Sequence, residues 1–338
     1  MASQKRGSDI VIGLSAVVIA VTAGEPRVLT VERALSGGEG AKRSTEGLAA
    51  LPAGPFDPLG HRTLELGLRS WVGEQTQLPL GYVEQLYTFA DLGREKGARD
   101  SDARLVSIGY LALTREAEPT GDGAALWQNW YRYFPWEDGR RGRPAMVASA
   151  IEPRLADWAA DTRNPEERRD REQRIRTTFG LAPVRWDEER VLERYELLYA
   201  AGLVSEARRD RGLAPDRTGA PLGEAMAMDH RRILATAMSR LRGKLKYRPV
   251  VFELMPPAFT LLQLQQSVEA LAGVALHKQN FRRLVEQGGL VERTGEWERG
   301  TGGRPAERFR FRREVLLERP APGVRLPIAR RIALTSSG

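Results

Sequence analysis

The polar side chains between residues 278 and 286 are of the kinds that bind nucleic acids. At 100° per residue they share one arc of a helix and its flanks: Lys278, Gln279, Asn280, Arg282, Arg283 and Glu286. An arginine can hold the major-groove edge of guanine with two hydrogen bonds. Asparagine or glutamine can do the same for adenine, and lysine anchors on phosphate. The spacing therefore predicts a helix face that contacts both bases and phosphates.

Two helices are expected to position that face. Thr260 can cap the first helix while Gln263 reaches back to the same turn, and Gly273 supplies the left-handed residue that ends it. The second helix is expected from about His277 to Gln287, with an apolar arc opposite the polar one. This pair has the order of a helix-turn-helix.

A basic hairpin follows the helix pair. Apolar and polar residues alternate from Leu290 to Trp297, turn residues occupy 298–305, and the chain returns from Ala306 to Phe311. Helix, helix and wing together predict DNA binding, with these candidate contacts: Thr260, Lys278, Gln279, Asn280, Arg282, Arg283, Thr301, Arg304 and Arg308. The alternatives are a solvated helix face and a wing that binds only protein.

The charge distribution favours a polyanionic partner for the last third of the chain. Residues 225–315 hold 17 Lys and Arg against nine Asp and Glu, whereas residues 1–224 hold 31 against 34. Residues 316–338 hold four against one. A basic domain attracts DNA and releases counterions from it. An acidic membrane surface is the rival partner, but it favours one long amphipathic helix with an aromatic face.

Composition excludes several kinds of site. A chain of 338 residues with 41% hydrophobic residues is long enough for two domains. The absence of cysteine removes disulfides, thiol nucleophiles and thiolate metal sites, and three scattered histidines form no ligand cluster. We therefore expect no metal site and no required cofactor.

The N-terminal apolar run has two interpretations. Lys5-Arg6 followed by Ile10 to Val21 resembles a secretory signal, but Ala23-Gly24 and the strand-like order of Pro26 to Glu32 favour a β-hairpin. No other run approaches the length of about twenty apolar residues that a membrane span requires. We expect a soluble cytoplasmic protein, associated with the nucleoid and not with a membrane.

The rest of the chain predicts further elements. A helix is expected at His61–Gln77 and strands at Tyr82–Phe89 and Leu105–Thr114, and later helices at 164–176, 187–204 and 228–245. Residues 206–221 have the composition of a linker. Six aromatic residues fall within 127–136. Such a cluster either stacks a planar ligand or, more often, fills a domain or subunit interface.

Six blocks of sequence, in order, resemble one family. They are Met228–Leu234, Leu241–Leu245, Phe252–Leu254, Phe259–Leu261, Asn280–Arg283 and Gly303–Ala306. This C-terminal half resembles that of the Nudix-related transcriptional regulators of NAD metabolism. The N-terminal half is similar to their Nudix fold at Pro52–Gly54, in the helix that follows, and at Leu86–Phe89.

The resemblance implies an α+β protein in which an N-terminal Nudix-like α/β/α sandwich precedes a C-terminal winged helix-turn-helix domain. The boundaries we expect are 1–115 for the Nudix-like sensor, 116–224 for an aromatic-rich insertion and helical linker, 225–315 for the winged helix and 316–338 for a basic, proline-containing tail.

The Nudix resemblance does not extend to the catalytic box. Carboxylates of that box gather divalent cations that activate water on a pyrophosphate. Aligned on the helix end, Ser70 to Leu78 keeps only Glu74 of the box carboxylates. Glu65 lies 180° away around the helix, so it cannot share an ion with Glu74. We therefore expect no enzymatic hydrolysis and a pocket kept as a sensor.

The pocket candidates are taken by position from the resemblance: Glu65, Arg69, Glu74, Tyr87 and Phe89. The expected effector is ADP-ribose, NAD or an adenine nucleotide. Against this, Glu65 and Arg69 have the spacing of a surface ion pair, and Tyr87 and Phe89 have that of core residues.

The resulting hypothesis is a homodimeric regulator, a repressor of NAD synthesis or salvage genes, on a near-palindromic double-stranded operator. The main alternative is an active Nudix pyrophosphohydrolase with an appended binding module. A third is an architectural DNA-binding protein without a sensor. Whether the effector releases or strengthens DNA binding is left open.

Overall fold

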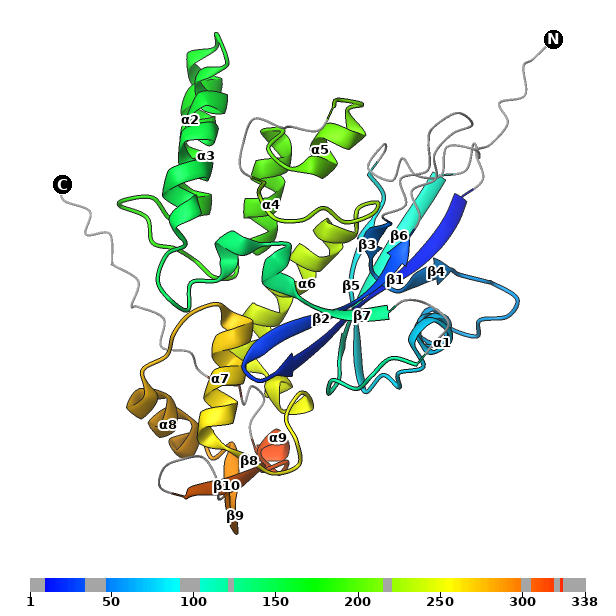
Figure 1. Ribbon diagram of the computed structural model, residues 1–338, viewed down its shortest axis with the longest axis vertical. Coiled ribbons are helices and arrows are strands. Elements are labelled where there is room, and N and C mark those ends of the chain that lie inside the picture. The colour runs from blue at the N-terminus through cyan, green and yellow to red at the C-terminus, as the bar shows by residue number, and fades with distance from the viewer. Residues whose placement is uncertain are drawn as a thin grey trace.

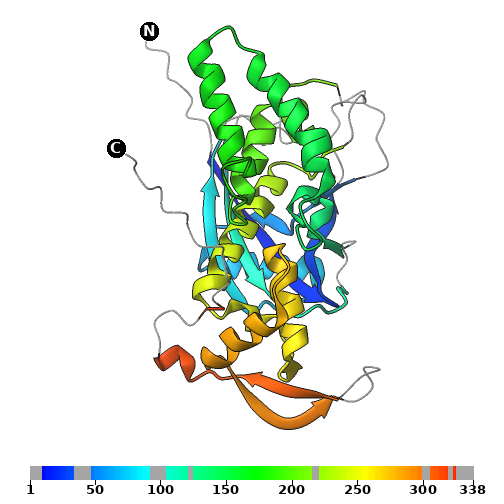
Figure 2. The ribbon, with the colours of Figure 1, turned by 90° about the vertical axis from the view of Figure 1, so that its left-hand side faces the viewer.

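A computed structural model of the chain describes residues 10–33, 47–91, 104–120, 125–214, 221–298, 305–318 and 323–324. Within these ranges the molecule is elongated, with a helical hairpin at one end and a small sheet at the other (Figures 1 and 2). The predicted DNA contacts Thr301 and Arg304 lie outside the described residues.

The N-terminal apolar run forms a β-strand. Strand β1 (Ile10–Thr22) pairs antiparallel with β2 (Glu25–Arg33). Ala23 and Gly24 between them have φ angles of 51° and 74°, as a tight hairpin turn with the twist of the strands requires. The hairpin interpretation is confirmed, since this strand is the central, buried strand of the larger sheet.

The larger sheet has the strand order β3-β2-β1-β6-β5, with β1 and β6 parallel. Strands β4 and β7 pair with β1 and β2, respectively. The additional bounds are Leu48–Ala50 for β3, Ala53–Pro55 for β4, Tyr82–Phe89 for β5, Arg104–Leu113 for β6 and Ala125–Asn129 for β7. The predicted strand at residues 82–89 has the observed bounds, and its neighbour starts and ends one residue earlier than predicted.

Helices cover both faces of this sheet. Leu14 and Val18 of β1 pack in one core with residues of α1 (Leu64–Thr76). Val17 and Ile19 point the other way and pack in a core shared with α6 (His230–Tyr247). The α/β/α sandwich is thus confirmed. Its second helical layer comes from a helix that the sequence assigned to the DNA-binding domain.

The segment between the sheet and α6 is mostly helical. Its described residues form two 3-10 helices, a π-helical turn and four α-helices: Trp130–Arg132, Pro135–Glu137, Val147–Ile151, α2 (Glu152–Ala160), α3 (Pro165–Phe179), α4 (Val191–Ala200) and α5 (Ser205–Asp210). Helices α2 and α3 form the hairpin that projects away from the rest of the molecule in Figure 1.

Two predictions for this segment have different outcomes. The aromatic cluster fills an interface within the chain, because Trp130, Tyr133, Phe134 and Trp136 are buried in the core that joins the sheet to α4, α6 and α7. The linker prediction for 206–221 is wrong at its start. Glu206 lies in helix α5 and is buried. Its carboxylate forms an ion pair of 3.2 Å with Arg231 of α6.

The C-terminal part is a winged helix. Its elements are a 3-10 turn (Val250–Glu253), β8 (Phe259–Thr260), α7 (Leu261–Ala272), α8 (Lys278–Gln287), β9 (Val291–Glu298), β10 (Ala306–Phe311) and α9 (Val315–Glu318). Strand β8 joins the wing to make a three-stranded sheet of order β8-β10-β9. None of the helices in the described part of the chain has the length and apolarity to cross a membrane.

Candidate nucleic-acid interface

Helix α7 is held at both ends by the residues that the sequence indicated. The Thr260 hydroxyl accepts a hydrogen bond from the Gln263 N–H at 3.2 Å, and Gln263 Oε1 accepts one from the Thr260 N–H at 2.8 Å. This reciprocal capping box satisfies two N–H groups that a helix start otherwise leaves without partners. Gly273 ends the helix with φ 70°. Both predicted ends of the helix are confirmed.

Helix α8 turns one face to the core and the other outward. Phe281 and Val285 are buried, whereas Lys278, Arg282 and Arg283 are exposed. Burying a side chain of this size contributes about 1.5–3 kcal/mol, which fixes the helix by its apolar side. The polar arc predicted from the sequence therefore faces outward, as DNA contact requires.

The other polar residues of the α8 face are also accessible. Gln279 is exposed and Asn280 is partly buried. Arg283 Nη2 donates a hydrogen bond of 2.8 Å to Asn280 Oδ1. The asparagine therefore has its amide oxygen engaged and its amide N–H groups left to donate, which suits an acceptor on a base edge.

Thr260 is not placed to contact DNA in this structure. Only 6% of its surface is exposed, and its hydroxyl caps α7. The expectation that it touches the duplex is therefore at odds with its position, because so little of its surface is open to a phosphate. Thr260 positions the helix pair instead.

The wing arginines face glutamates across the hairpin. Arg310 pairs with Glu292 at 2.6 Å and Arg293 with Glu307 at 3.4 Å. Arg308, a predicted DNA contact, lies 3.7 Å from a Glu296 oxygen. In contrast, Lys278, Arg282 and Arg283 form no ion pair within the described ranges. Among the described residues, the cations of α8 are therefore more available to a polyanion than the paired arginines of the wing.

Much of the basic charge of α6 is used inside the molecule. Its cations pair with carboxylates of earlier segments: Arg231 with Glu206, Arg232 with Glu196, Arg242 with Glu137, Lys244 with Glu84 and Lys246 with Glu188. The net charge of residues 225–315 therefore overstates what DNA would meet. Residues 278–313 still hold ten Lys and Arg against five Glu.

A buried ion triad lies where α6 meets the end of α7. The Glu137 carboxylate contacts Arg194 at 2.5 Å and Arg242 at 2.7 Å, and all three side chains are fully buried. Burial by itself would raise the pKa of Glu137, but the two guanidinium groups outweigh it and hold that pKa below its usual range. The carboxylate is therefore charged and its removal would leave two buried cations.

The expected effector residues on α1 are engaged with one another and with nearby backbone. Glu65 pairs with Arg69 at 2.9 Å, and Arg69 also donates to the carbonyl oxygens of Leu80 and Gly81. Glu74 accepts a hydrogen bond from its helix neighbour Ser70 at 2.9 Å. The surface-pair interpretation of Glu65 and Arg69 describes what the structure shows.

The other two expected residues lie on β5, on the opposite face of the sheet from α1. Phe89 is 2% exposed, packs in the core shared with α6, and has the guanidinium of Arg232 5.3 Å from its ring centre. Tyr87 is 58% exposed and meets the Phe89 ring edge-on. The five expected residues are therefore not brought into one pocket, because the sheet separates the two sets.

Metal-binding groups are likewise not assembled. Among the residues that the structure describes, no group of three or more His, Asp or Glu side chains is placed to hold an ion. Glu65 and Glu74 lie nine positions apart on one helix, so they point in opposite directions.

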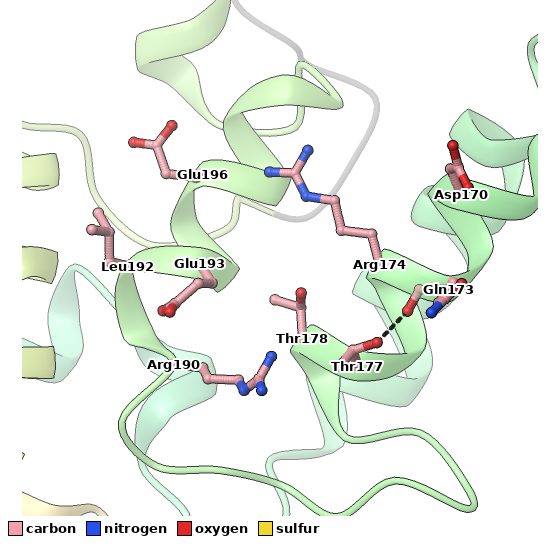
Figure 3. A pocket seen from close by; sticks show the side chains of 9 residues that line it. All are labelled: Asp170, Gln173, Arg174, Thr177, Thr178, Arg190, Leu192, Glu193 and Glu196. Carbon is pink, nitrogen blue, oxygen red and sulfur yellow. Dashed lines mark hydrogen bonds between the residues drawn. The ribbon is translucent and has the colours of Figure 1, made fainter. Parts of the chain in front are cut away.

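An open groove of about 660 Å³ lies between α3 and α4 (Figure 3). Arg174 and Thr178 line it from α3, and Arg190, Glu193 and Glu196 line it from the start of α4 and from α4 itself. The sequence predicted helices at 164–176 and 187–204 but gave no signal that they lie side by side with a groove between them. Both signs of charge line it, so its composition does not select one class of ligand.

Comparison with known proteins bears on the C-terminal domain most directly. Residues 251–311 match the family model of the NrtR DNA-binding winged helix domain. A curated relative, the ADPR responsive transcriptional repressor NtrR of Acinetobacter baylyi, is 41% identical over 86 residues. That alignment covers 25% of this chain and 34% of the relative, so the chain spans about a third of the length of the curated relative it matches.

Solved structures resemble the chain over most of its length. Shewanella oneidensis NrtR complexed with a 27mer DNA superposes with a TM-score of 0.52 and 21% identity, covering 90% of this chain and 94% of that one. A MutT/nudix family protein from Enterococcus faecalis gives 0.51 and 16%, covering 92% and 90%. The sandwich followed by a winged helix is therefore a known fold. The resemblance inferred from the sequence is confirmed by the match at residues 251–311.

Proposed function

We propose that this chain is a sequence-specific DNA-binding transcriptional repressor whose N-terminal sandwich senses an ADP-ribose-like nucleotide. The observation that carries the proposal is the outward face of α8, where three cations and two amides lie on a winged helix that matches the NrtR DNA-binding type. Base-edge and phosphate contacts need those groups in that position. NAD synthesis or salvage genes are the proposed targets.

Two copies would bind a near-palindromic operator with their α8 helices about 34 Å apart, one turn of the duplex. A homodimer is proposed because one recognition helix reads only a few base pairs. We propose the cytoplasm as its location.

The test uses duplexes that the parent protein selects from a randomised pool, compared with scrambled duplexes of the same composition. Arg282→Ala should lose about 1–3 kcal/mol of binding free energy on the selected duplex and less on the scrambled one. Gel-shift titration measures both values. Equal affinity of the variant and the parent for the selected duplex would reject the assignment of α8.

The effector proposal is supported by the printed name of the curated relative, which is an ADPR responsive repressor. In this chain Tyr87 offers an exposed aromatic ring, and such rings can stack on a purine. A ligand changes DNA binding only if it binds the two arrangements of the molecule with unequal affinity. Glu65, Arg69 and Glu74 could contribute only from the opposite face of the sheet, so we give Tyr87 the leading role.

Loss of hydrolysis is part of the proposal. Only one carboxylate of the catalytic box remains, and Mg²⁺ needs several oxygen ligands in octahedral geometry. Purified protein incubated with Mg²⁺ or Mn²⁺ and ADP-ribose should therefore show no steady turnover. Turnover that disappears in Glu74→Gln would establish the pyrophosphohydrolase alternative.

A further inference from the structure

The end of α7 is tied to residues far from it in the sequence. Two of its last carbonyl oxygens, and that of its capping residue Gly273, accept hydrogen bonds from outside the helix. Tyr131 Oη donates to Ala270 O at 2.8 Å, Arg242 Nε to Leu271 O at 3.0 Å, and the Gly139 N–H to Gly273 O at 2.8 Å. The last carbonyls of a helix have no partner within it, so these donors complete the helix end. The turn that leads to α8 starts there.

The same segment also holds the tip of the β1–β2 hairpin. Arg140 Nη1 donates to Gly24 O at 2.8 Å, and its other Nη atom lies 3.1 Å from a Glu25 oxygen. Asn129 Nδ2 donates to Glu25 at 2.7 Å. Residues 129–140 therefore contact the sheet at one place and the helix-turn-helix at another. Figure 1 shows the hairpin tip beside α7.

The segment is itself firmly anchored. Tyr131 is buried, and Trp130 and Trp136 beside it are fully buried. Glu137 forms the triad with Arg194 of α4 and Arg242 of α6, so both helices also bind this segment. Charged groups in such a setting are costly to separate, because each would be left buried without its partner. A movement of the segment would therefore be transmitted to the helix that it caps.

We propose that residues 129–140 position the recognition helix relative to the sheet, with Tyr131 and Gly139 as positioning residues for DNA recognition. The inference rests on the proposed function, since it concerns how that DNA-reading face is aimed. It assigns the aromatic segment a role in recognition, although none of its residues lies on α8.

Small changes in the orientation of α8 would affect its contacts with bases. Helix α8 has ten residues and so is about 15 Å long. A tilt of about 5° moves its far end by about 1 Å, which takes a hydrogen bond out of its normal range of about 2.7–3.2 Å. Base-specific contacts depend on this geometry, whereas contacts to phosphate tolerate more variation. Loss of positioning should therefore reduce specific binding more than non-specific binding.

The test compares Tyr131→Phe with Tyr199→Phe. Both substitutions remove one hydroxyl donor, but the Tyr199 hydroxyl donates to Asp210 at 2.9 Å, between α4 and α5, and does not touch α7. Affinity for the selected and the scrambled duplex is measured by fluorescence anisotropy well below the unfolding midpoint. There a small loss of global stability leaves the protein folded and so does not change affinity.

Tyr131→Phe should lose about three- to tenfold in affinity for the selected duplex and little for the scrambled one, in the range of coupling effects that such contacts produce. Tyr199→Phe should match the parent. Gly139→Ala is a second variant, because its added Cβ would lie 2.8 Å from Gly273 O and must displace backbone. Parent-like affinity in both Tyr131→Phe and Gly139→Ala would overturn the inference.

Hydrogen exchange provides a readout without DNA. Amides of residues 274–290 should exchange faster in Tyr131→Phe than in the parent or in Tyr199→Phe. Unchanged exchange there would also count against the positioning role. Failure of the parent to distinguish the two duplexes is a different result, because it would reject the proposed function and leave the exchange measurement to decide the inference.

Discussion

Arg282 and Arg283 are neighbours on α8 but have different surroundings. Both are exposed, yet Arg283 donates to Asn280 and so helps to orient a second candidate for base contact. Arg310, on the wing, is also exposed but already pairs with Glu292 at 2.6 Å. A phosphate would have to compete with that carboxylate. The availability of these arginines for DNA contact therefore depends on the side chains they already pair with, and not on exposure alone.

This difference gives a prediction for Arg283→Ala. The variant loses a guanidinium and the hydrogen bond that orients Asn280, so specific binding should weaken by about 1–3 kcal/mol and base preference should relax. Arg310→Ala is the matched control, which should lose less and lose it alike on every sequence. Anisotropy titrations on selected and scrambled duplexes measure both effects. A larger loss of specific binding in Arg310→Ala than in Arg283→Ala would assign base contact to the wing and not to α8.

A second residue-scale prediction concerns Glu137. Replacing it by glutamine leaves Arg194 and Arg242 buried without a counter-charge, so the free energy of unfolding at pH 7 should fall by about 3–5 kcal/mol. Denaturant unfolding of the variant and the parent gives the difference.

The pH dependence of that difference has a defined sign. The pKa of Glu137 is lower in the folded than in the unfolded chain, so its stabilisation is fully present above the ordinary pKa of glutamate, about 4.3. It is lost as the pH falls below that value through the folded-state pKa. The parent and Glu137→Gln should thus converge in acid, and a gap that stays constant down to the acid unfolding of the parent would contradict a charged triad.

At the scale of elements, local signals were reliable where one turn or one cap decides the structure. Ala23-Gly24 predicted the hairpin, Thr260 with Gln263 predicted the start of α7, and the bounds of β10 were predicted as observed. Each of these depends on residues within about four positions of one another. The backbone conformation at such positions is set locally, so the sequence alone could indicate it.

Contacts between distant segments could not be predicted in this way. Tyr131 and Ala270 lie 139 positions apart, and nothing in either sequence neighbourhood indicates the other. The basic residues of helix α6 were counted toward the charge of the DNA-binding domain, but they pair with Glu84, Glu137 and other earlier carboxylates. Composition shows how many charges a segment has and not which of them are already paired.

Thr260 gives the element-scale prediction. As the cap of α7, its replacement by alanine should lower the free energy of unfolding by about 1 kcal/mol, and serine should restore most of it. DNA affinity measured well below the unfolding midpoint should stay close to that of the parent, since the hydroxyl is inside the molecule. Weaker DNA binding with unchanged stability would instead make Thr260 a direct contact.

At the scale of the whole molecule, one continuous core runs from the sheet through α4 and α6 to α7 and α8. The sandwich and the winged helix are therefore packed together and are not joined only by a linker. The sheet is connected to α7 and α8 through α6, through residues 129–140, and through the β1–β2 hairpin, which packs directly against α7. Such an arrangement is suited to the proposed regulation, in which a ligand on the sandwich changes the orientation of α8 in the winged helix.

The effector proposal predicts thermal stabilisation. ADP-ribose should raise the unfolding midpoint of the parent, because a ligand that binds only the native state stabilises it by mass action. Tyr87→Ala should reduce the shift. Tyr247→Ala is the matched control. The Tyr247 ring is as exposed as that of Tyr87, but it lies at the C-terminal end of α6, whereas Tyr87 meets Phe89 beside Arg232 near the start of that helix. An equal shift in both variants would remove Tyr87 from the site, and no shift in the parent would reject ADP-ribose as the effector.

The central claim is that α8 reads a DNA sequence, and one measurement addresses it directly. It is the ratio of affinities of the parent for its selected duplex and for a scrambled duplex, at one physiological salt concentration. The account predicts a ratio of about 10³ or more, as specific DNA-binding proteins show. A ratio near one, with both affinities falling equally as salt rises, would show charge attraction without reading and would contradict the account.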